Sequence, residues 1–475
     1  MEDIVLIGRQ NEYERLNECL KSAEPQLIGI YGRRRVGKTF LINNFFNGRF
    51  DFKITGIYNK PAEIQLESFI TEYNSQTQSE SPIPKNWMEA FALLKSYILT
   101  ISDKEKQVVF FDEMPWLDTQ RSDFMTAFEW FWNGWANSRK NLVFIVCGSA
   151  ASWMRKNFDE NVGGLYRRLT CRLYLKPFTL HETEEYLKQK GIEWSRYYIT
   201  ECYMIMGGIP YYLSLLKSSL TYDQNIDNIF FRKRSELWDE FMFLYKTLFS
   251  NSDQYIKVVE ALSTKRSGLT RNEIQTATKL PNNGKLSEIL FNLEYSGFIR
   301  INDFYGKKTK VYQLSDYYTL FYFKYIKNNY GKDEHFWSNM GASPSRTAWA
   351  GLTFEQICKD HTTQIKKKLG ISGVLSEVSV WSIDGDDDHK GVQIDMLINR
   401  RDMVTNLCEV KYSTGEYEIN KSDDENFRNK IGSFRDNTKT KNAIHFTMIT
   451  TYGVKKNKYY NIVNSEVTMD DLFEE

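Results

Sequence analysis

Residues 32–39, GRRRVGKT, follow the apolar run QLIGIY and lead directly into KTFLINNFF. They fit the pattern G-x-x-x-x-G-K-[ST], and they stand between an expected strand and an expected helix, which is the context that the motif requires. In such a loop the backbone N–H groups curl around phosphate oxygens, and the helix that follows adds the positive end of its dipole. The stretch therefore predicts a phosphate-binding loop in an α/β fold, on a sheet of parallel strands.

Two side chains of this loop have distinct expected tasks toward bound ATP. Lys38 is expected to reach the β- and γ-phosphates, and Thr39 to ligate the Mg²⁺ that accompanies the nucleotide. The residues expected to bind the nucleotide in and beside the loop are Gly32, Arg35, Val36, Gly37, Lys38, Thr39 and Phe40.

A second stretch, VVFFDE at 108–113, supplies the acids that such a site needs. A buried apolar strand that ends in an acid places Asp112 at the carboxyl edge of the sheet, where it can hold the Mg²⁺ shell. Glu113 follows at once and is expected to orient and deprotonate the water that attacks the γ-phosphate. The runs 26–31, 107–112 and 141–147 are continuously apolar, as expected for strands buried on both faces.

Length and composition restrict the class of protein. A chain of 475 residues with a net charge of +1 predicts several domains, and any basic surface must be local. The six cysteines are scattered without metal-ligand spacing, which favours reduced thiols in a cytoplasmic protein. No basic leader precedes an apolar stretch and no apolar run is long enough for a membrane span, so we expect no membrane partner.

The middle of the chain changes character after a mainly helical stretch that ends near residue 250. Three short amphipathic helices are expected at 255–263, 269–278 and 285–297. Two strands follow at 298–303 and 310–315, with a Gly-Lys-Lys turn between them. This order is typical of a winged helix-turn-helix. Seven basic residues lie near its expected DNA-facing elements, which makes DNA an expected partner: Lys265, Arg266, Arg271, Lys285, Lys307, Lys308 and Lys310. The alternative is a structural spacer between two other domains.

The last part of the chain carries a second acidic constellation. Alternation along the expected strand at 405–413 places Glu409 and Lys411 on one face, and a hairpin brings Asp395 beside them. Two carboxylates and a lysine around one point suit metal-assisted phosphodiester hydrolysis, with Lys411 stabilising the transition-state charge. Glu355, on the expected helix at 354–370, could complete a shell of Mg²⁺ ligands. The acidic loop DGDDDHKG is expected to be a solvated hairpin tip.

The N-terminal motifs resemble the archaeal-type AAA ATPase family, close to the STAND branch of the P-loop NTPases. The resemblance rests on IGR at 7–9, the loop at 32–39, FFDE, CGSA, GGLYRR and GGIPYY, and it runs to about residue 250. It implies that Ile7 and Gly8 lie near the adenine and that Ser149 is the sensor residue at a strand tip. It further implies that Gly208 and Pro210 belong to a helical lid over the nucleotide.

The same resemblance gives a role to the pair Arg167 and Arg168. In relatives an arginine at this position approaches a γ-phosphate, which implies that the chain works as a homo-oligomer. The alternative is a basic turn on the surface. No sensor-2 arginine is evident, so slow, switch-like hydrolysis is expected rather than a processive motor.

The order of elements in the last domain resembles the PD-(D/E)XK nuclease-like fold, with Ile394–Asp395 in place of the usual Pro-Asp. The sequence thus predicts a P-loop ATPase core at 1–178, a helical lid at 179–250, a winged helix at 251–330, and a linker with a nuclease-like α/β domain at 331–475. The expected function is an ATPase that acts on nucleic acid and cuts it with Mg²⁺. The alternative is a nucleotide-dependent switch or scaffold whose last domain binds a partner without cleaving it.

Overall fold

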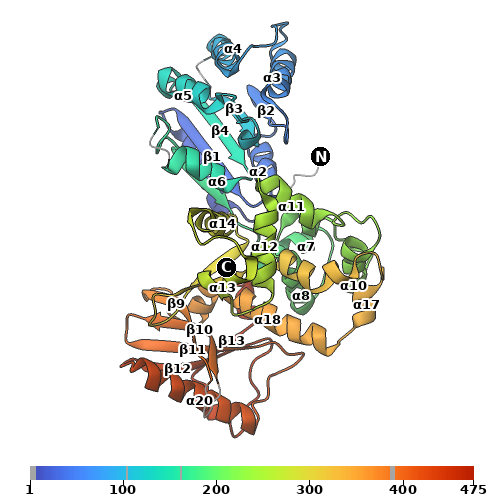
Figure 1. Cartoon of the computed structure of the whole chain (residues 1–475), viewed down its shortest axis with the longest axis vertical. Coiled ribbons are helices and arrows are strands. Elements are labelled where there is room, and N and C mark those ends of the chain that lie inside the picture. Colours follow the sequence, from blue (N-terminus) through green and yellow to red (C-terminus); the bar gives the residue numbers. More distant parts are fainter. Residues whose placement is uncertain (1–6, 103–104, 161–162, 386–390) are drawn as a thin grey trace. The chain divides into compact units, whose positions relative to one another are not determined.

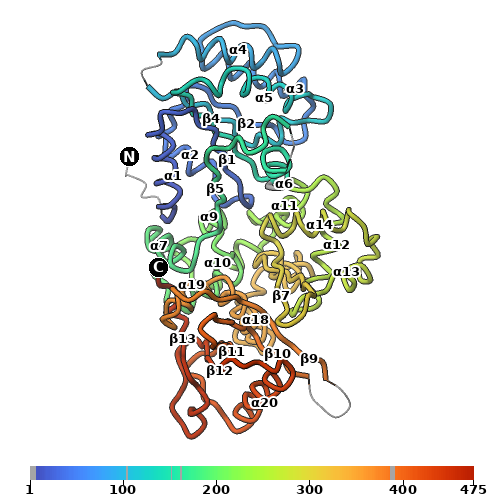
Figure 2. The backbone as a smooth tube through the Cα atoms, turned by 90° about the vertical axis from the view of Figure 1, so that its left-hand side faces the viewer, coloured from blue at the N-terminus to red at the C-terminus, as the bar shows by residue number. Residues whose placement is uncertain are grey.

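The computed structural model describes residues 7–102, 105–160, 163–385 and 391–475, which form two compact units (Figures 1 and 2). The first unit consists of Met1–Pro177, Phe243–Ser252 and Tyr295–Gly297, and the second of Phe178–Met242, Asp253–Glu294 and Phe298–Glu475. The expected acidic loop falls largely at 386–390, outside the described residues.

The first unit is built on a five-stranded parallel sheet of order β2-β3-β4-β1-β5. Its strands are β1 (Gln26–Gly32), β2 (Phe52–Thr55), β3 (Gln107–Asp112), β4 (Leu142–Gly148) and β5 (Cys171–Leu175). Every residue of β3 and β4 is buried, because these apolar runs are covered on both faces. The predicted parallel α/β sheet is therefore confirmed, and β4 lies between the strands that carry the loop at 32–39 and the acidic pair.

Helices cover this sheet on both sides (Figure 1). They are α1 (Gln10–Lys21), α2 (Lys38–Phe45), α3 (Ala62–Thr77), α4 (Trp87–Thr100), α5 (Phe124–Gly134) and α6 (Ala151–Arg155). One core joins α3, α4 and α5 to the sheet through fully buried aromatic rings, among them Phe69, Phe91, Phe111, Phe128 and Phe144. Such packing fixes the carboxyl ends of β1, β3 and β4 relative to one another.

The second unit begins with helices. They are α7 (Leu180–Gln189), α8 (Arg196–Met206), α9 (Pro210–Ser214) and α10 (Tyr222–Ile226), followed by α11 (Glu240–Leu248), which runs across the boundary between the units. The turn before α9 requires glycine, because Gly208 has φ +65° and a Cβ there would lie 2.1 Å from the Phe178 carbonyl oxygen.

The next segment, residues 252–314, follows the expected order of elements. It comprises α12 (Ser252–Ser263), β6 (Leu269–Thr270), α13 (Arg271–Thr278), α14 (Gly284–Tyr295), β7 (Ile299–Asp303) and β8 (Lys310–Leu314). The strands form a small antiparallel sheet of order β6-β8-β7. Thr270 caps α13 in a capping box with Glu273, which fixes where that helix begins.

The chain ends in a mixed five-stranded sheet of order β13-β12-β11-β10-β9, reached through further helices. The helices are α15 (Tyr317–Phe321), α16 (Lys327–Asn329), α17 (Phe336–Met340), α18 (Pro344–Asp360), α19 (Thr362–Lys368) and α20 (Lys421–Thr438). The strands are β9 (Ser376–Ile383), β10 (Val392–Arg400), β11 (Val404–Lys411), β12 (Ala443–Thr450) and β13 (Ser465–Thr468). Strands β9, β10 and β11 run antiparallel, and α20 crosses over to place β12 parallel to β11.

The single helix expected at 354–370 differs from the structure. Helix α18 begins ten residues earlier, at Pro344, and the backbone breaks at His361 before α19. The buried His361 ring explains the break: its Nε2 accepts a hydrogen bond from the Leu180 amide at 3.1 Å, and its Nδ1 lies 2.8 Å from the Ile357 carbonyl oxygen. A contact to a residue 181 positions away overrides the local helical pattern.

Candidate functional site

The loop at 32–39 has the backbone that its sequence predicts. Gly32 has φ +147°, and a Cβ there would lie 2.4 Å from the Leu175 carbonyl oxygen, so no other residue fits without a shift. Arg35 and Gly37 have φ values of +71° and +91°, which turn the loop before α2 begins at Lys38. The loop thus curls over the N-terminus of α2, as a phosphate-binding loop does.

The ammonium group of Lys38 is buried inside this curl. Its Nζ donates to the carbonyl oxygens of Gly32 at 3.0 Å and Arg33 at 3.1 Å, and to the Ser149 hydroxyl at 3.0 Å. These partners are dipoles rather than a carboxylate, so they orient the ammonium without neutralising its charge. Lys38 is therefore suited to binding an anion at this place.

The acids predicted on β3 lie beside the loop. Asp112 accepts a hydrogen bond from the Thr39 hydroxyl at 2.8 Å, which brings the two predicted Mg²⁺ ligands together. Glu113 accepts two hydrogen bonds from Ser149, from the hydroxyl at 2.6 Å and from the amide at 3.0 Å. Ser149 thus lies between Lys38 and Glu113 at the end of β4, close to both of the groups that a sensor residue would link.

Burial shapes the acidity of this pair. The pKa of Asp112 is raised by burial and then by the neighbouring Glu113, while the Thr39 hydroxyl, the Cys147 thiol and the Lys38 ammonium lower it. A carboxylate that is penalised by desolvation and by a like charge gains most from a nearby cation. Glu113 itself has φ +44°, an uncommon backbone for a residue with a side chain.

The segment before α1 also reaches the loop. Arg9 donates from its Nη2 to the carbonyl oxygens of Val36 at 3.3 Å and Lys176 at 2.8 Å. Ile7 and Gly8 directly precede Arg9, which braces the loop through these hydrogen bonds. Sequence reasoning missed the role of Arg9, because nothing in IGR says which backbone the guanidinium meets. The part of Ile7 and Gly8 toward adenine stays a prediction.

The remaining residues that are predicted to contact the nucleotide differ in their solvent exposure. Val36 is buried and the Phe40 side chain is 49 % exposed. Arg167 and Arg168 are exposed, with the Arg167 guanidinium 5.1 Å from the centre of the Tyr166 ring. Pro210 begins α9 in the second unit. The proposed roles of the two arginines and of Pro210 stay predictions.

Comparison with known proteins agrees with this geometry. Residues 6–216 match a family described as an ATPase domain predominantly from Archaea. The N-terminal part of the chain is similar to archaeal-type ATPases. The match supports ATP binding and ATPase activity for this part, which is less than half of the 475 residues.

Relatives of the whole chain are distant. An uncharacterized protein of Methanocaldococcus jannaschii is 27% identical over 415 residues, which cover 86% of this chain and 88% of that protein. A Walker-type ATPase of Pyrococcus abyssi is similar with a TM-score of 0.47 and 18% identity, covering 67% of this chain and 96% of that one. The Aeropyrum pernix ORC2 protein, in ADPNP and ADP complexes, has a TM-score of 0.44 and 13% identity over 75% of this chain and 95% of its own. Among the described residues, no helix has the length and apolar character that a membrane crossing demands.

A second cluster of charges lies in the C-terminal sheet. The register of β10 and β11 pairs Met396 with Cys408, and Asp395 and Glu409 are the next residues along the two strands. Asp395 falls where the register of β9 and β10 shifts between Ile394 and Leu397. Such irregularities re-aim side chains and are common beside active sites. The Asp395 carboxylate accepts a hydrogen bond from the Val410 amide at 2.9 Å.

Glu409 is held by two lysines. Its Oε1 lies 2.8 Å from the Lys411 ammonium, and its Oε2 accepts a hydrogen bond of 2.5 Å from the Lys430 ammonium. The Glu409 side chain is only 3% exposed, whereas the Lys411 side chain is 31% exposed. Lys430 comes from α20, and sequence reasoning missed it because a lysine on a polar helix carries no signal of what it meets.

Glu355 and Lys359, one helical turn apart on α18, complete the cluster. Burial, followed by Asp395, raises the pKa of Glu355 to about 8. Burial, followed by Glu409, raises the pKa of Asp395 to about 6, and Lys430 opposes this rise. The pKa of Lys359 is lowered by burial and by Arg300. The four predicted residues Glu355, Asp395, Glu409 and Lys411 are thus brought to one place.

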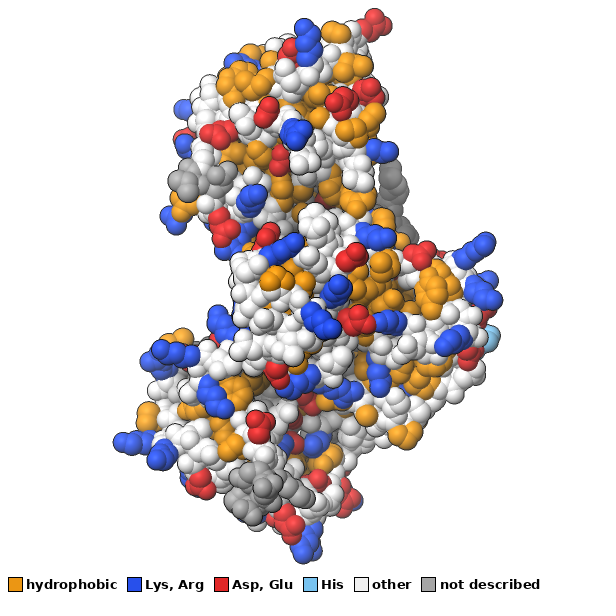
Figure 3. All heavy atoms as spheres, in the orientation of Figure 1, with side chains coloured by type: hydrophobic (Ala, Val, Ile, Leu, Met, Phe, Trp, Pro, Cys, Tyr) orange, Lys and Arg blue, Asp and Glu red, His pale blue; other side chains and the backbone are white. Residues whose placement is uncertain are grey.

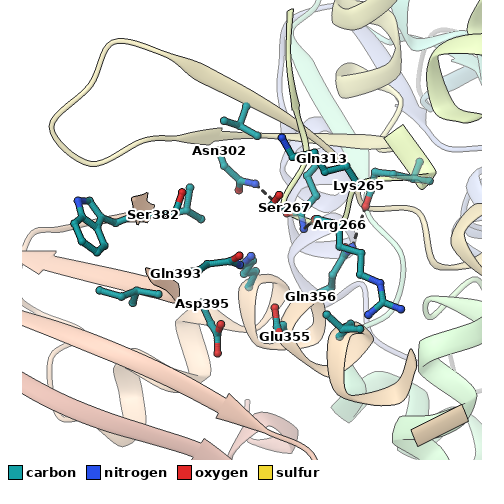
Figure 4. Close-up of a pocket in the computed structure, with 18 of the residues that line it drawn as sticks. Lys265, Arg266, Ser267, Asn302, Gln313, Glu355, Gln356, Ser382, Gln393 and Asp395 are labelled. Carbon is teal, nitrogen blue, oxygen red and sulfur yellow. Dashed lines mark hydrogen bonds between the residues drawn. The ribbon is translucent and has the colours of Figure 1, made fainter. Parts of the chain in front are cut away.

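The cluster opens into a cavity of about 1180 Å³ (Figure 4). The predicted acids and lysines line it on the C-terminal side, and residues of the 252–314 segment line it on the other. Within the described part of the chain, no three His, Cys, Asp or Glu side chains stand close enough to hold a metal ion. The described residues therefore show no preassembled three-carboxylate shell. In addition, both oxygens of Glu409 contact ammonium groups.

Proposed function

We propose that this chain is an ATP-hydrolysing protein whose C-terminal domain hydrolyses phosphodiester bonds of nucleic acid with Mg²⁺. The observation that carries the second half is the meeting of Asp395, Glu409 and Lys411 on neighbouring strands, with Glu355 entering from α18. The order helix, three antiparallel strands, crossover helix and parallel strand supports a PD-(D/E)XK-like domain.

In the N-terminal domain each residue has a task toward ATP. Lys38 binds the phosphates, Thr39 and Asp112 hold Mg²⁺, and Glu113 takes a proton from the attacking water. Ser149 keeps Glu113 oriented through its hydroxyl and amide. Because Lys38 and Glu113 are both hydrogen-bonded to Ser149, binding of the phosphates to Lys38 would change the hydrogen bonding of the base Glu113.

The two arginines at 167 and 168 are proposed to complete the site of a neighbouring copy. Both are exposed and neither forms an ion pair that would hold it on its own surface among the described contacts. ATP turnover per chain should then rise with protein concentration. Turnover that is independent of concentration, in a preparation shown to be monomeric, would leave Arg167 and Arg168 as surface charges.

The donors of the C-terminal cluster suit a hard divalent cation. Asp395 and Glu409 supply carboxylate oxygens, which Mg²⁺ prefers, and their mutual repulsion is what such a cation relieves. The cation would supply positive charge to the phosphodiester and activate water. Lys411 is placed to stabilise the negative charge that develops at phosphorus, and Lys430 must release Glu409 before that carboxylate can bind the cation.

The alternative is a nucleotide-dependent switch whose C-terminal domain binds a partner without cutting it. The observation that favours it is the pairing of Glu409 with two lysines, since a charge-satisfied cluster is stable without any metal. Under this alternative Lys411 has a structural role only.

Incubation of the full-length chain with labelled DNA and RNA separates the two. We expect shortened products with Mg²⁺ or Mn²⁺, none with EDTA, and a rate that changes when ATP is added. Calorimetric titration of Mn²⁺ into the same chain should show uptake that Asp395→Asn abolishes. If neither products nor uptake are found while ATP is still hydrolysed, the switch is the correct description.

A further inference from the structure

The cavity beside Asp395 is bounded by two parts of the second unit, the 252–314 segment and the C-terminal domain. The turn at 265–267, Asn302, Lys307 and Gln313 form one wall, while Glu355, Asp395 and Lys411 stand on the other. Figure 4 shows Lys265, Arg266 and Ser267 on the side opposite Asp395 and Gln393. A ligand that reaches the carboxylates therefore meets the 252–314 segment as well.

The 252–314 segment is attached to the C-terminal domain through its wing, the β7–β8 hairpin. The Tyr305 amide donates to the Val380 carbonyl oxygen at 2.9 Å, and the Tyr305 ring lies 5.3 Å from that of Phe434. Arg300 on β7 pairs with Asp360 at the end of α18 at 2.6 Å. A wing held in this way is not available to lie in a DNA groove away from the cavity.

Helix α14 is the helix that a winged helix would insert into the major groove, and its exposed face is poorly suited to that task. The exposed residues along it are Gly284, Lys285, Ser287 and Glu288. A single lysine beside a carboxylate gives little attraction for phosphates. Arg271, another predicted DNA contact, instead donates to the Asn282 side chain at 2.6 Å and to the Asn283 carbonyl oxygen at 2.9 Å.

The cavity itself has the chemistry of a site for a polar, anionic chain. Among the described lining residues seven are basic and five acidic, so basic side chains surround the buried carboxylates. Side-chain amides add hydrogen-bonding groups, as in the pair Asn302 and Gln313, whose amides are joined at 2.9 Å. Phe304 adds an aromatic ring to the wall, with the Lys307 ammonium 4.5 Å from its centre. Cations, amides and an aromatic ring together suit phosphates and bases.

The size of the cavity and the charge of the drawn surface restrict which form of nucleic acid the cavity can bind. A volume of about 1180 Å³ is close to that of small-molecule sites and is far too small for a double helix, whose major groove alone is about 12 Å wide. On the face drawn in Figure 3 basic and acidic side chains are interspersed, in keeping with the net charge of +1.

We propose that this cavity binds an unpaired stretch of a nucleic-acid strand, with the 252–314 segment and the C-terminal domain each supplying one wall. The proposal rests on the proposed function in one respect, namely that the phosphates of this strand reach Asp395 and Lys411. The substrate is then single-stranded nucleic acid or the unpaired end of a duplex, and Lys307 is a contact to its backbone.

The test measures binding of a labelled single-stranded oligonucleotide and of a blunt duplex of the same sequence to the full-length chain, by fluorescence anisotropy in EDTA. We expect the single strand to bind at least about tenfold more tightly than the duplex, since only unpaired phosphates and bases enter the cavity. Lys307→Glu should weaken single-strand binding about tenfold and flatten its salt dependence by about one unit of slope.

Lys308→Glu is the matched control, because Lys308 is its exposed neighbour in the wing and does not line the cavity. It should change the affinity less than about twofold. Equal affinity for duplex and single strand, or an equal loss in the two variants, would overturn the proposal, as would duplex binding that depends on Lys285. Cleavage is measured separately with Mg²⁺. Single-strand binding without cleavage overturns the proposed function alone, and cleavage of duplex without preference overturns the inference alone.

Discussion

The nucleotide site of the first unit and the carboxylate–lysine cluster of the second both place acids beside a buried lysine, but the lysines are held differently. Lys38 donates to two carbonyl oxygens and a hydroxyl. Lys411 and Lys430 are both paired with the carboxylate of Glu409. The Lys38 ammonium is thus hydrogen-bonded by uncharged groups, whereas the Lys411 and Lys430 ammonium groups form ion pairs with Glu409.

This difference implies two kinds of activation. Under the proposed function, the first site is ready for ATP as it stands, since Ser149 already joins Lys38 of the loop to the proposed base Glu113. Under the proposed function, the second would become competent when a cation binds at Glu409, both oxygens of which contact ammonium groups. A divalent cation is the natural replacement, and it makes the second site conditional in a way that the first is not.

The largest expected effect concerns the base of the first site. Glu113→Gln should lower ATP hydrolysis by about 10²- to 10⁴-fold, since an amide cannot take a proton from water. ATP affinity should be unchanged, and Lys38→Ala should show the opposite pattern by weakening binding. Turnover and equilibrium binding of labelled ATP, measured on both variants, check this. Equal hydrolysis by wild type and Glu113→Gln would remove Glu113 from the mechanism.

A smaller effect is expected for the lysine of the second site. Lys411→Ala should reduce cleavage about 10²- to 10³-fold through lost stabilisation of the transition state, with Mn²⁺ uptake retained. Lys455→Ala is a suitable control, because Lys455 is also paired with a glutamate, Glu418 at 3.0 Å, on an exposed surface. Loss of Mn²⁺ uptake together with activity would show that Lys411 maintains the site rather than acting on substrate.

Competition between the Lys430 ammonium and a cation for Glu409 can be tested by replacing Lys430. Lys430→Met removes the ammonium that competes for Glu409, so the affinity for Mn²⁺ should rise about tenfold. Arg428→Met, on the exposed face of the same helix, should leave the affinity unchanged, since the described contacts of Arg428 are to Asp424 and Asn461 and do not involve Glu409. Calorimetry on the full-length chain gives both values. A weaker Mn²⁺ affinity in Lys430→Met would mean that Lys430 orders Glu409 rather than competing for it.

The smallest effect is on stability as a function of pH. The pKa values of Glu355 and Asp395 are raised in the folded chain, to about 8 and about 6. The folded state therefore binds more protons than the unfolded state between the ordinary carboxyl pKa and these values, and the free energy of unfolding falls as pH rises through that window. In metal-free buffer, denaturant unfolding should show this slope from about pH 5 to pH 8, and Glu355→Gln should flatten it. A slope unchanged by Glu355→Gln would assign it to other groups.

The sequence was most informative where function is carried by neighbouring residues. The loop at 32–39 and the pair Asp112 and Glu113 are continuous motifs on buried strands, so their geometry follows from local backbone rules and the parallel sheet. The strands expected at 107–112 and 141–147 agree with β3 and β4 to within one residue at each end.

Contacts between distant parts of the chain could not be predicted in the same way. Lys430 meets Glu409 only because α20 crosses back over the sheet, and His361 breaks a helix through a bond to Leu180. The position of the wing depends on a distant contact in the same way. Lys307 lines the cavity because Tyr305 pairs with Val380. These outcomes depend on tertiary packing, which leaves no periodicity or spacing in the sequence.

The central claim is that one chain holds two independent hydrolytic sites, and a single substitution tests it most directly. Asp395→Asn removes a charge from the second site without changing its size, and Asp395 belongs to the second unit whereas the loop at 32–39 belongs to the first. Cleavage of a labelled single strand with Mg²⁺ and turnover of ATP should be measured on the same preparations of wild type and variant. We predict that cleavage is lost and ATP turnover is kept. Cleavage that persists in Asp395→Asn, or is absent from the wild type, would contradict the account.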